Sequence, residues 1–141
     1  MAELSLEIIT PSKALFSGSV KSVTIPGTAG SFQVLVNHAP IISTFEIGLL
    51  TIQLPNKDKV YYSTSGGTVE VLDNKVLVLA DAVEQVENID IHRAKSALER
   101  AKERLGHKDS KEVDITRAEL ALARAINRIN IAEKYGNRIE A

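Results

Sequence analysis

The chain has 141 residues, of which 44% are hydrophobic and 25% are charged, with no cysteine and a formal net charge of −1. This composition is typical of a globular protein, and it excludes a disulfide framework and thiol chemistry. Residues 1–88 hold five lysines and no arginine against nine acidic residues, whereas residues 89–141 hold twelve basic residues against nine acidic ones. The basic excess is small and interspersed with acids, so the sequence does not predict a nucleic-acid partner.

The N-terminal sequence MAELSLEIITP lacks the basic region and the long apolar stretch of a signal peptide. No run in the sequence approaches the roughly 20 apolar residues that a transmembrane helix needs. We therefore expect a protein that works inside a cell or organelle and makes no direct insertion into a membrane.

Residues 1–87 are predicted to form a β domain. Short runs rich in Val, Ile, Leu and Thr alternate with turn signals such as PGTAG, NHAP and SGG; the runs are LSLEII, SVKSVTI, SFQVLV, LLTIQL, KVYYST, TVEVL and KVLVLAD. Such spacing indicates an all-β sandwich or barrel. The sequence VEVLDNKVLVL predicts one hairpin, in which Asp73 and Asn74 form the turn because both residue types tolerate positive φ.

Residues 88–141 are predicted to form an antiparallel hairpin of two helices. Asp90 and Asp114 are placed as N-caps, Gly106 suits the C′ position after the first helix, and the second helix is expected to end near Tyr135. Apolar residues, most of them alanine, recur at intervals of three and four positions in both segments. The fold class is therefore α+β: a flattened antiparallel β-sandwich or barrel followed by a two-helix hairpin.

The two helical segments repeat one pattern at a distance of twenty-four positions. The first copy consists of Asp90, Ile91, Arg93, Ala94, Ala97, Leu98, Arg100, Ala101 and Arg104, and the second of Asp114, Ile115, Arg117, Ala118, Ala121, Leu122, Arg124, Ala125 and Arg128. We hypothesise that this repeat gives two matching helix faces. In that case the four alanines Ala94, Ala101, Ala118 and Ala125 lie in the contact between the helices.

Two features of the β part invite a catalytic or phosphate-binding interpretation. His38 is the only histidine there, but no nucleophile or orienting acid has a recognisable spacing to it, which favours a histidine that fixes a turn or an interface. The GTAGS sequence is followed by a strand pattern and no lysine, unlike a phosphate-binding loop. The spacing of His, Asp and Glu predicts no metal site.

The arginines are the stronger candidates. Arg93 and Arg100 share a face of the first helix, and Arg124 and Arg128 lie one turn apart on the second. In an antiparallel hairpin their guanidinium groups could converge, and a polyphosphate between them would relieve their repulsion. The alternative is pairing with nearby carboxylates such as Glu99 and Glu103 on a solvated face. Spacing alone favours pairing with the neighbouring carboxylates and leaves the anion site open as the alternative.

Three segments resemble the epsilon subunit of F-type ATP synthases, and together they cover most of the chain. FSGSVKSVTIPGTAGSFQVLVNHAPII resembles the first half of that family, SGGTVEVLDNKVLVLAD its G-G-x-x-E-V hairpin and L-A-D strand, and IDIHRAKSALERAKERL its first C-terminal helix with an I/L-D-x-x-R-A motif. The resemblance implies a non-catalytic rotor subunit on the cytoplasmic face of a bacterial plasma membrane. Its β domain would contact the gamma subunit and the c-ring, with Gly30, Ser31 and Phe32 facing the c-ring and His38 facing gamma.

The resemblance also implies a regulatory role for the helical arm. In that family the hairpin can lie closed, held by ATP in some members, or extend so that its second helix enters the catalytic alpha/beta head and blocks ATP hydrolysis. Carried over by position, the ATP site would consist of Glu84, Ile89, Asp90, Arg93, Ala94, Arg100, Arg124 and Arg128. In the extended arm, acidic loops of the head would meet Arg124, Arg128, Lys134 and Arg138.

Two other function classes are left open by the residues alone. One is a free-standing adaptor that responds to nucleotide and binds an acidic partner through its helices. The other is a small β-barrel hydrolase, which would require turnover by the isolated chain. Recovery in a complex with a gamma subunit would distinguish the rotor subunit from both.

Overall fold

The computed structural model describes residues 2–107 and 114–136, and the chain divides into two compact units, Met1–Gln85 and Val86–Ala141. The sequence patterns placed this boundary between residues 87 and 88. The first unit consists of strands and the second of helices, as predicted.

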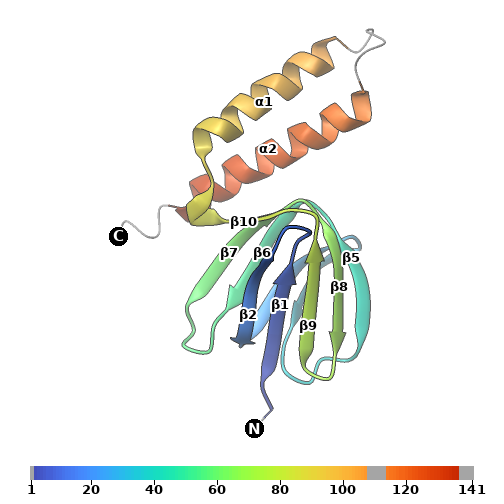
Figure 1. Cartoon of the computed structure of the whole chain (residues 1–141), viewed down its shortest axis with the longest axis vertical. Helices are drawn as coiled ribbons and strands as arrows, with labels where there is room; N and C mark the ends of the chain where they lie inside the picture. Colours follow the sequence, from blue (N-terminus) through green and yellow to red (C-terminus); the bar gives the residue numbers. More distant parts are fainter. Residues whose placement is uncertain (1, 108–113, 137–141) are drawn as a thin grey trace. The chain divides into compact units, whose positions relative to one another are not determined.

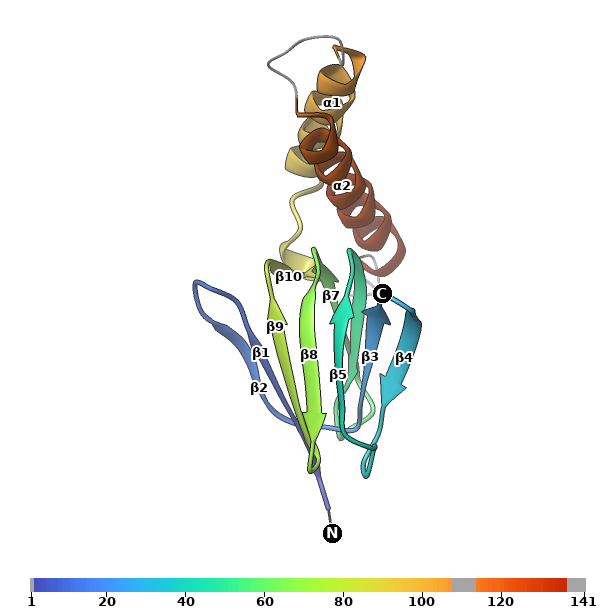
Figure 2. The ribbon, with the colours of Figure 1, turned by 90° about the vertical axis from the view of Figure 1, so that its right-hand side faces the viewer.

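The β unit forms one hydrogen-bonded sheet in the order β10-β7-β6-β3-β5-β8-β9-β1-β2, with β4 paired to β3 (Figure 1). The strands are β1 Leu4–Ile9, β2 Ala14–Val20, β3 Ser22–Gly27, β4 Gly30–Val34, β5 Ile41–Phe45, β6 Gly48–Gln53, β7 Lys59–Thr64, β8 Gly67–Leu72, β9 Lys75–Ala80 and β10 Val83–Gln85. The sheet folds over at β3, which pairs with β6 through Ser22–Thr24 but with β5 only at Gly27 (Figure 2). The result is the predicted flattened sandwich.

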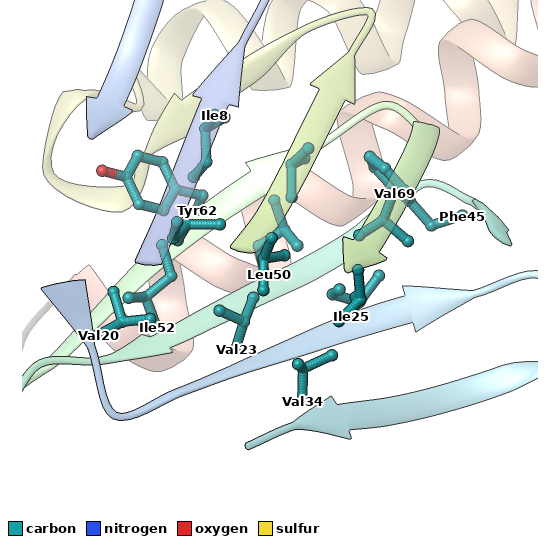
Figure 3. Packing of buried hydrophobic residues seen from close by; sticks show 14 of the residues in the cluster. Ile8, Val20, Val23, Ile25, Val34, Phe45, Leu50, Ile52, Tyr62 and Val69 are labelled. Atoms are coloured by element: carbon teal, nitrogen blue, oxygen red, sulfur yellow. The ribbon is translucent and has the colours of Figure 1, made fainter. Parts of the chain in front are cut away.

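Large aliphatic side chains fill the space between the two layers. In β1, Leu4, Leu6 and Ile8 are buried while the alternating Ser5 and Glu7 are exposed, as expected for a strand with one face on the core. Figure 3 shows side chains of both layers pointing toward one another; the labelled residues are Ile8, Val20, Val23, Ile25, Val34, Phe45, Leu50, Ile52, Tyr62 and Val69. Full burial of each such aliphatic side chain contributes about 1.5–3 kcal/mol.

One strand pair departs from the antiparallel prediction. β1 pairs with β2 antiparallel but with β9 parallel, in the register Ser5↔Lys75 to Ile9↔Leu79. A parallel pair needs a long connection, and the chain between Ile9 and Lys75 supplies one. The predicted run SVKSVTI also divides, because Val20 ends β2 and Ser22 begins β3.

The turn between β8 and β9 is as predicted. Asp73 and Asn74 have φ angles of 49° and 62°, which place both in the left-handed region that a tight hairpin turn requires. The Asn74 side chain also joins this turn to the loop before β5, because its Oδ1 accepts a hydrogen bond from the backbone N–H of Asn37 at 2.6 Å.

The helical unit begins with a short 3-10 helix, η1 (Val86–Asn88), followed by α1 (Ile91–Gly106) and α2 (Ile115–Tyr135). Both predicted N-caps are confirmed: the backbone N–H groups of Arg93 and Arg117 donate to Oδ1 of Asp90 and Asp114 at 3.1 and 3.0 Å. None of the described helices is long and apolar enough to span a membrane.

The prediction for Gly106 is wrong. Gly106 is the last residue of α1, not the residue after its cap, and the N–H of His107 donates to the carbonyl of Arg104 at 3.1 Å. This tighter last turn satisfies a terminal carbonyl, so no left-handed glycine is needed there.

α1 and α2 lie side by side and antiparallel, and their contact is made largely of alanine (Figure 1). The buried residues of α1 are Ala94 and Ala101, which are 0% and 1% exposed, and Ala118 and Ala125 of α2 are each 2% exposed. The hypothesis that the repeated alanines face each other is therefore confirmed.

Candidate functional site

The six arginines of the described chain all lie in α1 and α2, and each has a fixed relation to the alanine contact. Four of them directly precede a buried alanine and two follow one by three positions; in that order they are Arg93, Arg100, Arg117 and Arg124, then Arg104 and Arg128. A step back of one residue and a step forward of three both turn the helix toward the same side, by about 100° and 60°. All six arginines therefore lie on one flank of their helix.

The antiparallel arrangement brings these two flanks to the same side of the hairpin. Two antiparallel helices whose buried stripes face each other are related by a twofold axis perpendicular to the plane of the pair. Residues at the same offset from the stripe consequently lie on the same broad face. We call this surface the arginine face; it consists of Arg93, Arg100, Arg104, Arg117, Arg124 and Arg128.

The arginine face has three rows. α1 ends at Gly106 and α2 begins at Ile115 on the same end of the hairpin (Figure 1). Counted from that end, Arg104 and Arg117 each lie two positions in and Arg93 and Arg128 each lie thirteen in, while Arg100 and Arg124 lie between them, six and nine positions in; we name these pairs the loop-end, open-end and middle rows. From the loop-end row to the open-end row the distance along the helix axis is about 16 Å.

The two carboxylates considered as partners of the arginines lie off the arginine face. Glu99 and Glu103 lie five and nine positions after Ala94, which places Glu103 on the outer side of α1, one turn from Arg100, and Glu99 on the flank away from the arginines. Glu99 forms an exposed ion pair with Lys102 at 3.9 Å on that flank. Within residues 2–107 and 114–136, the guanidinium groups of Arg93, Arg100 and Arg124 have no hydrogen bond or ion pair. Pairing with Glu99 and Glu103 thus does not explain these arginines.

The guanidinium groups of Arg93, Arg100 and Arg124 repel one another, and an anion that binds them removes the repulsion. Guanidinium groups bind phosphate oxygens through paired hydrogen bonds, which makes a polyphosphate chain a suitable anion. A hollow on α1, lined by His92, Arg93, Ser96 and Arg100, borders the arginine face. The described geometry therefore suits phosphate binding across both helices.

Seven of the eight residues in the expected ATP site belong to the helical unit. Arg93, Arg100, Arg124 and Arg128 form the open-end and middle rows of the arginine face. The carboxylate of Asp90 caps α1. Ala94 is buried in the helix contact, and Ile89 is 8% exposed with its backbone N–H bonded to the carbonyl of Val86 at 3.2 Å. These last three residues shape the start of α1.

Glu84, the eighth residue, lies in the first unit. It is the central residue of β10, half-buried, and it pairs with Ser63 of β7 across the sheet. Because Glu84 and the other seven residues belong to different units, its membership in the site stays a prediction.

The residues expected to contact the c-ring occupy the hairpin between β3 and β4. Gly30 has a φ of +131°, which favours glycine, and pairs with Gly27; Ser31 follows it, exposed. Phe32 is half-buried and packs against the core. The loop thus presents small residues at its tip, with a phenylalanine anchoring its base.

His38 lies in the loop between β4 and β5 and is half-buried. Its Nδ1 donates to the carbonyl oxygen of Ala39 at 2.7 Å, and its backbone N–H donates to Leu35. An imidazole held by its own loop suits the interpretation as a turn or interface residue better than that of a general base. The assignment to an interface with gamma stays a prediction.

The sequence patterns missed an apolar surface on the outside of the sandwich. Ile42 on β5 is 74% exposed, and Leu72 on β8 and Leu79 on β9 are each 47% exposed. These strands are neighbours in one layer, so the three side chains share its outer side. We call them the apolar outer face. The available signal was KVLVLA, a strand apolar at both alternating positions, which is typical of burial on both sides.

Comparison with protein families assigns both parts of the chain. Residues 3–86 match the β-sandwich domain of the ATP synthase delta/epsilon chain, and residues 87–133 match the long α-helix domain of the same chain. The two matches follow one another in this order and cover nearly the entire described structure.

Curated relatives agree over most of their length. The ATP synthase epsilon chain of Desulforamulus reducens is 44% identical over 91% of this chain and 96% of its own, and that of Macrococcus caseolyticus is 39% identical over 94% and 98%. The ATP synthase epsilon chain of Salinibacter ruber is 45% identical over 73% of this chain and 74% of its own.

Solved structures share the fold. A chain in the cryo-EM structure of the Euglena gracilis mitochondrial ATP synthase, an assembly of OSCP, F1 and c-ring, matches with a TM-score of 0.78 at 25% identity, covering 90% of this chain and 79% of that one. A chain in the central stalk and c-ring structure of the Tetrahymena thermophila mitochondrial ATP synthase has a similar fold, with a TM-score of 0.56 at 14% identity. From both domain matches and these relatives, the chain belongs to the ATP synthase delta/epsilon chain family.

Proposed function

We propose that the chain is the epsilon subunit of an F-type ATP synthase, a non-catalytic part of the central stalk at the cytoplasmic face of a bacterial plasma membrane. The observation that carries this proposal is the match of both domains, in order, to the delta/epsilon chain together with relatives named ATP synthase epsilon chain over more than nine-tenths of their length. In this role the subunit couples gamma to the c-ring.

The β unit supplies the docking surfaces. Exposed Ile42, Leu72 and Leu79 cost free energy in water, and a partner that covers them recovers about 25 cal/mol for each Å² of apolar surface buried. We assign this apolar outer face to gamma, with His38 at the same interface, and we assign the loop of Gly30, Ser31 and Phe32 to the c-ring.

The helical unit acts as a regulatory arm, for which the alanine contact and the arginine face provide the physical basis. Alanines bury little apolar surface, so the closed hairpin is weakly held by packing alone. The open-end and middle rows of the arginine face exist only while α1 and α2 lie side by side. ATP bound to both rows stabilises the closed arm, because a ligand shifts an equilibrium by its difference in affinity for the two states.

In the extended arm, α2 binds the catalytic alpha/beta head and blocks ATP hydrolysis. Arg124, Arg128 and the exposed Lys134 near the end of α2 then meet acidic loops of the head. Arg138, the fourth residue expected in this contact, lies outside the described residues. The same arginines therefore serve the closed arm with ATP and the extended arm without it.

Calorimetric titration of the isolated protein with ATP and ADP tests the proposal that bound ATP holds the arm closed. We expect clear binding of ATP, weaker binding of ADP, and a loss of ATP affinity of at least about tenfold in Arg93→Ala, since a charge-assisted hydrogen bond contributes about 1.5–3 kcal/mol. Lys95→Ala is the matched control, because it removes an exposed cation of α1 outside the arginine face. No binding at millimolar ATP would reject the ATP-held arm.

The rotor assignment has a separate test. The chain is expected to co-purify with a co-expressed gamma subunit, and Leu72→Ser combined with Leu79→Ser should abolish this while leaving the isolated protein folded. Lys59→Ser, at an exposed position of β7 in the opposite layer, should retain the complex. Equal loss in both variants would reject the apolar outer face as the docking surface.

A further inference from the structure

The expected ATP site uses only two of the three rows of the arginine face. Its four arginines come from the open-end and middle rows, and Arg104 and Arg117 of the loop-end row are left without a role. Both are exposed. The carboxylates beside this face are those of the capping Asp90 and Asp114 and, at its outer edge, Glu103, which are fewer than the six arginines, so two further cations there increase the repulsion.

The hairpin has an approximate twofold symmetry that relates the used arginines to the unused ones. The N-caps of the two helices have nearly the same geometry, with φ and ψ of −85° and 103° at Asp90 and −86° and 102° at Asp114. Each cap accepts a hydrogen bond from the arginine three positions later, and an alanine buried in the helix contact follows that arginine directly. The repeat of twenty-four positions is thus preserved in three dimensions.

The symmetry maps the phosphate-binding half of the ATP site onto the loop end of the hairpin. A shift of twenty-four positions takes Arg93 to Arg117, Arg100 to Arg124, and Arg104 to Arg128. The set Arg93, Arg100, Arg124 and Arg128 is therefore replaced by Arg117, Arg124, Arg100 and Arg104. The two sets share the middle row, and the loop-end set has the same number of guanidinium groups from the same two helices.

We propose that Arg104 and Arg117, together with the middle row, form a second polyphosphate-binding site at the loop end of the hairpin. This inference rests on the closed arm proposed above, in which α1 and α2 lie side by side. The ligand is a chain of phosphates, either inorganic or the phosphate part of a nucleotide. A ligand at each end neutralises the outer rows. Because both sites use the middle row, binding of a ligand at one site lowers the affinity of the other site for phosphate.

The two ends differ in the residues that border the arginines. His92 and Ser96, which line the hollow on α1, correspond to Thr116 and the 48%-exposed Leu120 on α2. The loop end therefore has fewer polar groups beside its phosphate site. It is consequently expected to bind pyrophosphate more weakly than the open end.

The test is a titration of the full isolated chain, labelled with nitrogen-15, with pyrophosphate, followed by the amide signals of the arginine face in two-dimensional NMR spectra. One titration uses the free protein and the other uses protein saturated with ATP. The second shows whether pyrophosphate still binds the loop end when nucleotide is present, and so distinguishes inorganic phosphate from the phosphate part of a nucleotide as its ligand. We expect amide signals of Arg104 and Arg117 to shift in both. In Arg104→Gln combined with Arg117→Gln, pyrophosphate should bind this end at least about tenfold more weakly, while ATP affinity changes by less than about threefold.

The matched control is Lys95→Gln combined with Lys102→Gln, which removes two exposed cations of α1 outside the arginine face. It should keep the loop-end response within about threefold of the parent chain, and circular dichroism should show the same helix content in both double variants. Equal weakening in the two variants would overturn the second site, because the response would then reflect net charge alone. A response at Arg104 and Arg117 without any ATP binding would instead reject the ATP-held arm and retain the second site.

Discussion

The two units of the chain are stabilised by contacts of very different strength. The β-sandwich buries large aliphatic side chains such as Ile8, Leu50 and Ile52, each 0% exposed. The helical hairpin buries four alanines in the contact between its helices, with Ile131 and Ala132 near the end of α2. Burial scales with apolar area, so packing stabilises the sandwich more strongly than it stabilises the contact between the two helices. The difference suits the proposed roles of a fixed docking domain and a movable arm.

The largest expected effect is the loss of a core side chain of the sandwich. Leu50→Ala should lower the free energy of unfolding of the β unit by about 2–5 kcal/mol, because it removes buried methyl groups and leaves a cavity. Urea unfolding followed by the near-ultraviolet circular dichroism of Tyr61 and Tyr62, both on β7, would measure it. The control is Leu72→Ala, the same substitution at a residue that is 47% exposed. Equal losses would show that the sandwich core is not the dominant source of stability.

A smaller effect is expected when the helix contact is overfilled. Ala101→Leu places a large side chain where the helices approach closely, and overpacking costs about 1–3 kcal/mol. Amide hydrogen exchange should accelerate in α1 and α2 and stay unchanged in the sandwich strands, because the two units are separate compact bodies. ATP affinity should fall with it.

The exposed Ala123 of α2 provides the control for this substitution. Ala123→Leu adds the same side chain on the solvated side of the helix and should leave exchange and ATP affinity nearly unchanged. If Ala101→Leu instead slowed exchange, the alanine contact would contain space to be filled, and the weakness of the hairpin would need another cause.

In both units, features that depend on neighbouring residues were predictable from the sequence, whereas the pairing of distant strands was not. The Asp73–Asn74 turn and the Asp90 and Asp114 caps depend on a few neighbouring residues, and all were predictable from local chemistry. The parallel pairing of β1 with β9 joins segments far apart in the chain, and alternation within a strand carries no information about its partner. The prediction that Gly106 follows the cap of α1 was wrong because a helix end has several ways to satisfy its last carbonyl groups.

The arginine face was also predictable from the sequence only in part. Helical spacing placed Arg93 with Arg100 and Arg124 with Arg128. The face that each helix packs against the other becomes known only once the buried alanines are identified, and this face determines on which side the arginines lie. Arg104 and Arg117 are both part of the twenty-four-residue repeat in the sequence. That they form one row at the loop end follows only from the antiparallel arrangement of the helices. The exposed Leu72 and Leu79 were missed because apolar strand residues are ordinarily assigned to a core.

The two caps provide a third and smaller test of the hairpin. Asp114→Ala should destabilise α2 by about 1 kcal/mol, and Asp90→Ala should destabilise α1 by a similar amount, because the two caps share one geometry. Loss of helical signal in far-ultraviolet circular dichroism on heating would measure both. Asp114→Asn retains an oxygen acceptor and should keep most of the stability. A loss in Asp114→Asn as large as in Asp114→Ala would mean that the charge, and not the hydrogen bond, stabilises the helix start.

The smallest effect is expected on the flank of α1 opposite the arginines. The Lys102–Glu99 pair has side chains 59% and 75% exposed, so solvent screens it, and Lys102→Ala should change stability by less than about 0.5 kcal/mol. ATP affinity should also stay within about twofold, whereas Arg93→Ala removes a cation of the same helix and weakens binding at least about tenfold. Titration calorimetry of both variants would compare the two flanks directly. If they weakened ATP binding equally, the hairpin would attract nucleotide by its overall charge, and the positions of the arginines around the helix would carry no specificity.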